Sequence, residues 1–298
     1  MGRGRARGVG GGRVKVTVRG VPYHLEIAGE PARERAVLLL HGFAGSGEDW
    51  AETTPRLREA GLAVVAVDLV GHGGSAATEE PERYTMRETV RDLDAILDAL
   101  RVERADWLGY SMGGRVALHL ALALPARVRS LILESASPGI ADAEARASRR
   151  AADDALADRI EERGVEWFAD YWRSIPLFET QWDLPEAVRE VLHARRLRNN
   201  PRGLARSLRG MGQGVQEYLG DRLAGLKCPL LLIAGERDLK YVEVSRSLWE
   251  AIPGSNCGIV AGAGHAVHLE APDAFAEALA DHWEAIEGAH AAQPSSHS

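Results

Sequence analysis

The stretch that decides the fold is Trp107 to Gly114, which reads WLGYSMGG. Residues 109–113 match the pattern G-x-S-x-G, in which a serine occupies a sharp turn between a strand and a helix. A short apolar run, Ala105 to Leu108, precedes the turn, and a helical pattern, Gly113 to Leu124, follows it. The helix N-terminus favours developing negative charge beside the hydroxyl. Because both flanking elements fit, Ser111 is predicted to be a nucleophile or base.

A serine hydroxyl is too weakly acidic to react unaided, so it needs a base and an acid that orients the base. Asp238 follows the apolar run PLLLIAG, and His265 follows a second run that ends at residue 262. Both lie at the carboxyl ends of predicted parallel strands, as Ser111 does, where open α/β sheets bind their ligands. We therefore predict that Ser111, Asp238 and His265 form a catalytic triad.

Two alternatives to this triad remain open. Glu236 can replace Asp238 as the orienting acid, because it lies in the same loop. His268 can replace His265 as the base, although His265 follows a glycine directly. His268 is otherwise a structural residue or part of a pocket wall.

Two backbone N–H groups are candidates for an oxyanion hole. Residues 38–45 read LLLHGFAG and place Phe43 just after a predicted central strand. The N–H of Phe43 and the N–H of Met112 would supply the two donors that such a site needs. The alternative is that this glycine-containing stretch is only a turn.

Strand and helix signals alternate along the chain. The residues from 14–18 and 23–27 alternate in polarity and predict an antiparallel hairpin at a sheet edge. Helical periodicity, as in Met86 to Leu100, separates the other runs and indicates βαβ units. Nearly continuous apolar runs, typical of strands buried on both faces, are Ala36 to Leu40, Ala63 to Val67, Leu131 to Leu133, Pro229 to Ala234 and Gly258 to Val260.

The strand signal disappears in one long internal segment. Residues 139–221 are helical in pattern and rich in Arg and Glu, which predicts a helical cap inserted into a core formed by residues 14–138 and 222–288. Residues 1–13 are rich in Gly and Arg and are expected to be a flexible leader. Residues 289–298 are expected to be a disordered tail.

Composition limits the function classes. The 298 residues carry 36 Lys plus Arg against 43 Asp plus Glu, a formal charge of −7, which argues against nucleic acid as partner. Two cysteines give neither a disulfide framework nor a zinc site. With no run of 18 apolar residues, no membrane is expected and the cytoplasm is the default location. Only three of the basic residues are lysines, and the 33 arginines suit bidentate recognition of carboxylates.

Together these residues resemble the α/β-hydrolase superfamily over residues 14–288, with the triad in the order Ser, Asp, His. A closer resemblance is to the 2-succinyl-6-hydroxy-2,4-cyclohexadiene-1-carboxylate synthase family of menaquinone biosynthesis. The LRGMG sequence and Gln216 are its most specific signature. Four stretches carry the match: GYSMGGRVAL (109–118), SPGIADAEARASRR (137–150), WFADYWRSIPLF (167–178) and RRLRNNPRGLARSLRGMGQGVQ (195–216).

The resemblance implies a mostly parallel, eight-stranded sheet with helices on both faces and an inserted helical cap. It implies a lyase that eliminates pyruvate from 2-succinyl-5-enolpyruvyl-6-hydroxy-3-cyclohexene-1-carboxylate, with the triad acting as base. Neither a metal nor an organic cofactor is implied. Two other classes stay open: hydrolysis of an ester or of a carbon–carbon bond in a vinylogous diketone, and a binding protein without turnover. The oligomeric state is not predicted.

A small anionic substrate with several carboxylates needs cations with fork geometry. Arg115, Arg146 and Arg198 are the candidates by resemblance, and Arg149 and Arg196 are neighbours that the sequence cannot separate from the last two.

Two aromatic residues complete the predicted pocket. Trp172 is expected to form an apolar wall and Tyr110 to donate a hydrogen bond to the substrate, with core packing as the alternative for each. The chain departs from the family at Ala141, where a polar residue is frequent, and at Gln213, where Thr is common.

Overall fold

The central strands are buried on both faces, which explains their continuous apolar runs. In the computed structural model, which describes residues 12–291, alternate residues of β3 (Ala36–Leu40) enter opposite apolar clusters: Val37 and Leu39 enter one, and Leu38 and Leu40 enter the other. A strand with no solvent-facing side has no position for a polar residue. The predicted burial of these runs is confirmed.

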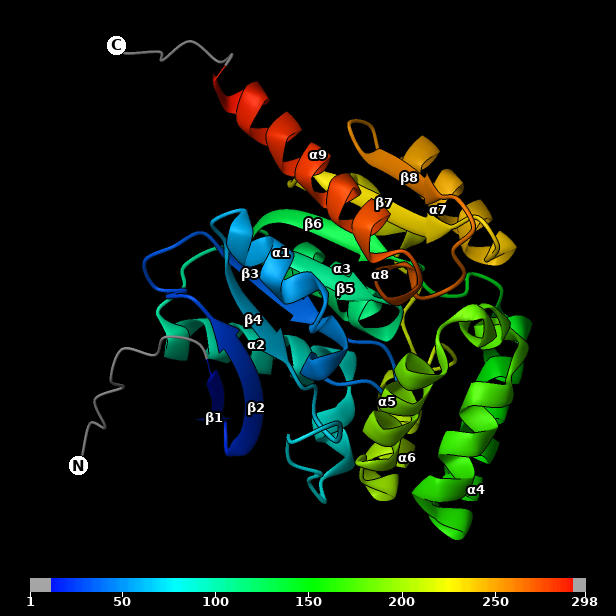
Figure 1. Cartoon of the computed structure of the whole chain (residues 1–298). Helices are drawn as coiled ribbons and strands as arrows, with labels where there is room; N and C mark the ends of the chain where they lie inside the picture. The colour runs from blue at the N-terminus through cyan, green and yellow to red at the C-terminus, as the bar shows by residue number, and fades with distance from the viewer. Residues whose placement is uncertain (1–11, 292–298) are drawn as a thin grey trace, which may run out of the picture.

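Eight strands form one sheet in the order β1-β2-β4-β3-β5-β6-β7-β8 (Figure 1). β1 pairs antiparallel with β2, and β2 pairs antiparallel with β4, whereas all other neighbours are parallel. The predicted edge hairpin and mostly parallel sheet are therefore confirmed. The other strands are β1 (Gly12–Val18), β2 (Val21–Ala28), β4 (Ala63–Val67), β5 (Ala105–Tyr110), β6 (Val128–Glu134), β7 (Leu230–Gly235) and β8 (Asn256–Val260).

Helices cover both faces of the sheet. One apolar cluster joins the sheet to α2 (Met86–Leu100), α3 (Met112–Ala123) and α7 (Leu239–Ala251). The other joins it to α1 (Thr53–Glu59), α8 (Val267–Glu270) and α9 (Pro272–Ala291). The helices and sheet together place the carboxyl ends of β5, β7 and β8 along one rim.

The segment between β6 and β7 contains helices and no strand. α4 (Ala143–Ser174), α5 (Glu186–Leu197) and α6 (Pro201–Met211) lie to one side of the sheet (Figure 1). α4 and α6 share a small apolar cluster with Ala44, which follows β3. α4 is interrupted at Gly164, whose φ of 81° is left-handed.

Residues 1–11 and 292–298 lie outside the described part of the chain, and with them most of the predicted leader and tail. Within the described part, both ends of the regular structure reach further than predicted. β1 includes Gly12 and Arg13, because their pairing with β2 continues to Ile27. α9 continues to Ala291 rather than ending before residue 289.

Candidate active site

The turn that holds Ser111 is strained and tightly packed. Ser111 has φ 51° and ψ −106°, an unusual conformation for a residue with a side chain. A Cβ atom on Gly113 would lie 2.2 Å from the carbonyl oxygen of Leu40, and one on Gly109 would lie 2.4 Å from the carbonyl oxygen of Gly113. The N–H of Ser111 donates to the carbonyl of Glu134 at 2.8 Å. The two glycines therefore allow the close approach that the G-x-S-x-G pattern predicts.

The three residues of the predicted triad lie in hydrogen-bonding contact. His265 Nε2 is 3.1 Å from Ser111 Oγ, and His265 Nδ1 is 2.6 Å from Asp238 Oδ2. His265 and Asp238 are buried. This geometry suits proton transfer from the hydroxyl to the imidazole, with the carboxylate orienting the ring.

The two alternatives to the triad have other partners. Glu236 accepts from the N–H of Gly262 at 3.0 Å on the protein surface. His268 contacts Glu134 Oε1 through Nδ1 at 2.9 Å, and both side chains are buried. Neither contacts Ser111.

The loop around His265 is fixed on both sides. Glu270 accepts from the N–H of Gly264 at 2.7 Å and from the N–H of Ala266 at 3.1 Å. The ring of Tyr241 lies 4.8 Å from the imidazole. The base is thus held by its backbone as well as by Asp238.

The two predicted oxyanion-hole residues line the same cavity as Ser111. The N–H of Phe43 has no acceptor among residues 12–291. Met112 is the first residue of α3, so its N–H has no partner within the helix. Both donors are available to a charged oxygen.

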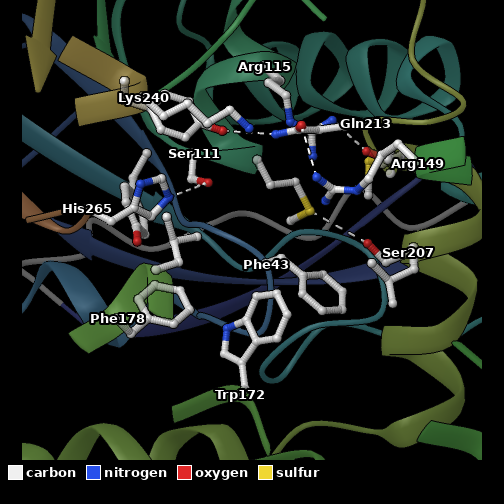
Figure 2. Close-up of a pocket in the computed structure, with 17 residues that line it drawn as sticks. Phe43, Ser111, Arg115, Arg149, Trp172, Phe178, Ser207, Gln213, Lys240 and His265 are labelled. Atoms are coloured by element: carbon white, nitrogen blue, oxygen red, sulfur yellow. Dashed lines mark hydrogen bonds between the residues drawn. The ribbon is translucent and has the colours of Figure 1, made fainter. Parts of the chain in front are cut away.

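The cavity has a volume of about 110 Å³ and two unlike walls (Figure 2). Figure 2 shows Arg115, Arg149, Gln213 and Lys240 along one wall. The opposite wall is aromatic and contains Phe43, Trp172 and Phe178. Ser111 and His265 lie between the two walls.

Arg115 is a buried cation without an acidic partner. It is 6% exposed, and its Nη1 donates to the carbonyl of Met211 at 2.7 Å and to Gln216 Oε1 at 2.8 Å. No carboxylate within residues 12–291 comes within 4.0 Å of it. Burial lowers the pKa of Arg115 to about 10, so the group is charged at neutral pH. An anion in the cavity would supply the missing counter-charge.

Of the two arginines near the start of α4, Arg149 lines the cavity and Arg146 does not. Arg146 Nη1 donates to the carbonyls of Ile140 and Ala141, which precede the helix. Arg149 pairs with Asp153 at 2.8 Å and donates to Gln213 Oε1 at 3.1 Å. The predicted Arg146 thus lies outside the lining of the cavity, whereas its neighbour Arg149 is part of it.

At the end of α5, the predicted Arg198 also lies outside the lining of the main cavity. Arg198 is exposed and pairs with Glu48. Arg196 donates to Gln181 at 3.0 Å and lies over the ring of Phe178. It lines a second cavity of about 30 Å³ that shares Phe43, Tyr110, Trp172 and Phe178 with the first. Burial lowers the pKa of Arg196.

The two predicted aromatic residues both line the main cavity. The ring of Trp172 is 5.2 Å from that of Phe43 and 5.6 Å from that of Phe178. Burial raises the pKa of Tyr110 well above its usual range, so its hydroxyl stays protonated.

The sequence analysis did not select Lys240, although it lines the cavity. The signal that could have found it is its position two residues after Asp238, in a chain with only three lysines. Gln213, a departure from the family, also lines the cavity and donates to the hydroxyl of Tyr241 at 2.9 Å.

The described part of the chain contains no cluster of three or more His, Cys, Asp or Glu side chains suited to a metal ion. None of its helices is both long and apolar enough to cross a membrane.

Comparison with known proteins gives consistent matches. A family model described as the alpha/beta hydrolase fold matches residues 35–272. A Bacillus subtilis (strain 168) protein, whose name assigns it provisionally as a 2-succinyl-6-hydroxy-2,4-cyclohexadiene-1-carboxylate synthase, is 40% identical over 91% of this chain and 98% of its own. A Klebsiella pneumoniae (strain ATCC 700721) protein with that synthase name is 34% identical over 82% of this chain and 92% of its own. The solved structure of MenH from S. aureus has a TM-score of 0.83 and 31% identity, over 88% of this chain and 98% of that one.

Proposed function

The chain belongs to the α/β-hydrolase family and, within it, to the 2-succinyl-6-hydroxy-2,4-cyclohexadiene-1-carboxylate synthases, and we propose the reaction as follows. The enzyme eliminates pyruvate from 2-succinyl-5-enolpyruvyl-6-hydroxy-3-cyclohexene-1-carboxylate in menaquinone biosynthesis. Ser111, Asp238 and His265 are its triad, in a core domain covered by a cap of residues 139–221. The proposed location is the cytoplasm.

One observation carries this proposal: the buried, unpaired guanidinium of Arg115 shares a cavity with Ser111 and His265. A buried charge without a partner is costly, so a site that keeps one is built for a ligand of opposite charge. A neutral ester needs no such group. The substrate carries several carboxylates, which Arg115, Arg149 and Arg196 would bind.

In the proposed mechanism the triad acts as a base toward carbon. The hydroxyl of Ser111 passes its proton to His265 Nε2 while Oγ takes a proton from the ring carbon next to the succinyl carbonyl. The resulting charge spreads onto the carbonyl oxygen, which the N–H groups of Phe43 and Met112 stabilise. Each such donor lowers the barrier by about 3 kcal/mol in comparable sites. The electrons then form the new double bond as the carbon–oxygen bond to the enolpyruvyl group breaks.

Hydrolysis of an ester is the second candidate, because a serine 3.1 Å from a histidine can also attack a carbonyl carbon. The two reactions use the same triad and differ in the substrate. The charged wall of the cavity favours the anionic substrate over neutral esters.

The test measures pyruvate release from the enolpyruvyl substrate with a lactate dehydrogenase coupled assay. Wild type should release one pyruvate per substrate, and Ser111→Ala should abolish turnover while still binding substrate. Arg149→Met should raise KM, whereas the matched control Arg150→Met, on the exposed side of the same helix, should change nothing. Strong hydrolysis of p-nitrophenyl esters without pyruvate release would establish the esterase instead. Full activity of Ser111→Ala would refute any role for the triad.

A further inference from the structure

The three lysines of this chain are not placed alike. Lys15, in β1, and Lys227, before β7, are exposed on the protein surface. Lys240, the second residue of α7, is also exposed, but it lines the cavity that holds Ser111 and His265. The other 33 Lys or Arg residues of the chain are all arginines.

Lysine and arginine differ in one property that matters at a reactive site. Arginine keeps its proton at any physiological pH, whereas lysine can release one when its surroundings disfavour the charge. The cavity already contains two guanidinium groups, Arg115 and Arg149, that supply fixed positive charge. A lysine beside them adds a proton that can be transferred.

The surroundings of Lys240 favour release of that proton. Burial and the charge of Arg149, from α4, lower the pKa of Lys240, and Asp238, which precedes α7, opposes the shift. The nitrogen lies 5.4 Å from the ring centroid of Tyr241 and has no carboxylate within 4.0 Å among residues 12–291. The residue is exposed to solvent, so water can restore its proton after each turnover.

Apart from the two arginines, the other titratable groups of the cavity are less available as proton donors. Burial raises the pKa of both Tyr110 and Tyr241, which makes their hydroxyls weaker proton donors. His265 is engaged with Asp238 and Ser111 on the side of the base. Lys240 is the remaining titratable donor of the lining.

We propose that Lys240 is a catalytic residue, the general acid that protonates the departing enolpyruvyl oxygen. The inference rests on the proposed function. As the carbon–oxygen bond breaks, its electron pair goes to that oxygen, which takes a proton from the Lys240 ammonium. The products are the cyclohexadiene and the enol of pyruvate, which tautomerises in water. His265 now holds the proton taken from carbon and Lys240 is neutral, so proton exchange through water returns both to their starting states.

The decisive comparison is between Lys240→Arg and Lys240→Met, with Lys227→Met as the control. Lys240→Arg keeps the charge but removes the transferable proton. Both Lys240 variants should lose about 10²-fold or more in kcat. KM should stay within a few-fold of wild type in Lys240→Arg, and Lys227→Met should match wild type. Thermal melting should be unchanged, because Lys240 is at the surface end of the cavity. Full kcat in Lys240→Arg would overturn the assignment, because fixed charge would then suffice.

A second measurement varies the leaving group. Fluorine on the enol methylene makes the departing oxygen less basic, so its departure needs less help from an acid. The loss in kcat caused by Lys240→Met should therefore be smaller with the fluorinated substrate. An equal loss with both substrates would show that Lys240 does not protonate the leaving group. If wild type itself releases no pyruvate, the proposed function fails, and the role of Lys240 fails with it.

Discussion

Replacing Arg115 by Met tests whether the cavity is built for an anion. Met keeps most of the apolar length of the side chain and removes the guanidinium. That group lies one helical turn after Ser111, with two neutral acceptors and no carboxylate partner. We expect the variant to lose substrate binding while keeping nearly all of its stability.

The stability change comes from two opposing effects. The pKa of Arg115 falls from 12.5 to about 10 on folding. Below pH 10 the buried charge therefore lowers the free energy of unfolding by ~3 kcal/mol, and this loss becomes smaller as the pH rises above 10. Removing the guanidinium recovers that cost. It also removes two hydrogen bonds and leaves the carbonyl of Met211 and the oxygen of Gln216 without a donor, at about 1–3 kcal/mol each. The free energy of unfolding should therefore change by no more than about 3 kcal/mol.

The effect on catalysis should be much larger. Loss of one partner of a buried, hydrogen-bonded charge pair costs about 2–5 kcal/mol in recognition. We therefore expect kcat/KM for the enolpyruvyl substrate to fall about 10²-fold or more. Urea unfolding and the coupled pyruvate assay measure the two quantities, and Arg150→Met controls for the loss of an exposed arginine. A large loss of stability with unchanged kcat/KM of the folded fraction would mean that Arg115 is a structural residue, and would refute the reasoning.

Three further predictions concern the frame around the site. Gly113→Ala should lower the free energy of unfolding by more than ~2 kcal/mol in urea and abolish turnover, because its Cβ would lie 2.2 Å from a carbonyl oxygen of β3. The control Gly258→Ala should leave stability nearly unchanged, because open space surrounds Gly258. Burial lowers the pKa of His282 to about 4, so the unfolded chain binds more protons there between pH 6.5 and 4. Stability should fall by ~3 kcal/mol across that range, and His282→Leu should remove this part of the pH dependence in urea titrations. Glu134→Gln should destabilise the protein by about 1–3 kcal/mol and lower kcat, because Glu134 holds both the N–H and the ring of His268; unchanged values would show that the pair is dispensable.

The sheet and the contacts among Ser111, Asp238 and His265 were predictable because local sequence determines them. A strand buried on both faces is nearly continuously apolar, so the run from residue 36 to 40 predicts a central strand. The strained turn at Ser111 needs a glycine on each side, which leaves a short and recognisable pattern. The loops after parallel strands meet on one rim, so chain order alone placed Asp238 and His265 near Ser111.

The choice among the cap arginines was not predictable from local sequence. Two arginines, Arg149 and Arg150, follow Arg146 by three and four residues. Helical periodicity therefore places each of them near the face of Arg146. Arg149 reaches the cavity because Asp153 and Gln213 hold its guanidinium there, and Gln213 comes from a distant part of the chain. At the other arginine cluster, α5 ends at Leu197, which leaves Arg198 beyond the helix and exposed. A long-range contact decides the first case, and the end of α5 decides the second.

The cavity at Ser111 is smaller than a groove elsewhere on the surface, but only the cavity contains the candidate catalytic residues. A surface groove of about 600 Å³ lies beside α2 and α6, but it contains no residue of the triad. The cavity at Ser111 holds about 110 Å³, below the ~300 Å³ at which small-molecule sites begin. It must therefore enlarge to hold the proposed substrate. Ser111, Arg115, His265 and Lys240 all come from the core, whereas Trp172 and Phe178 come from the cap. Displacement of Trp172 and Phe178 would therefore widen the cavity and leave Ser111, His265, Arg115 and Lys240 in place.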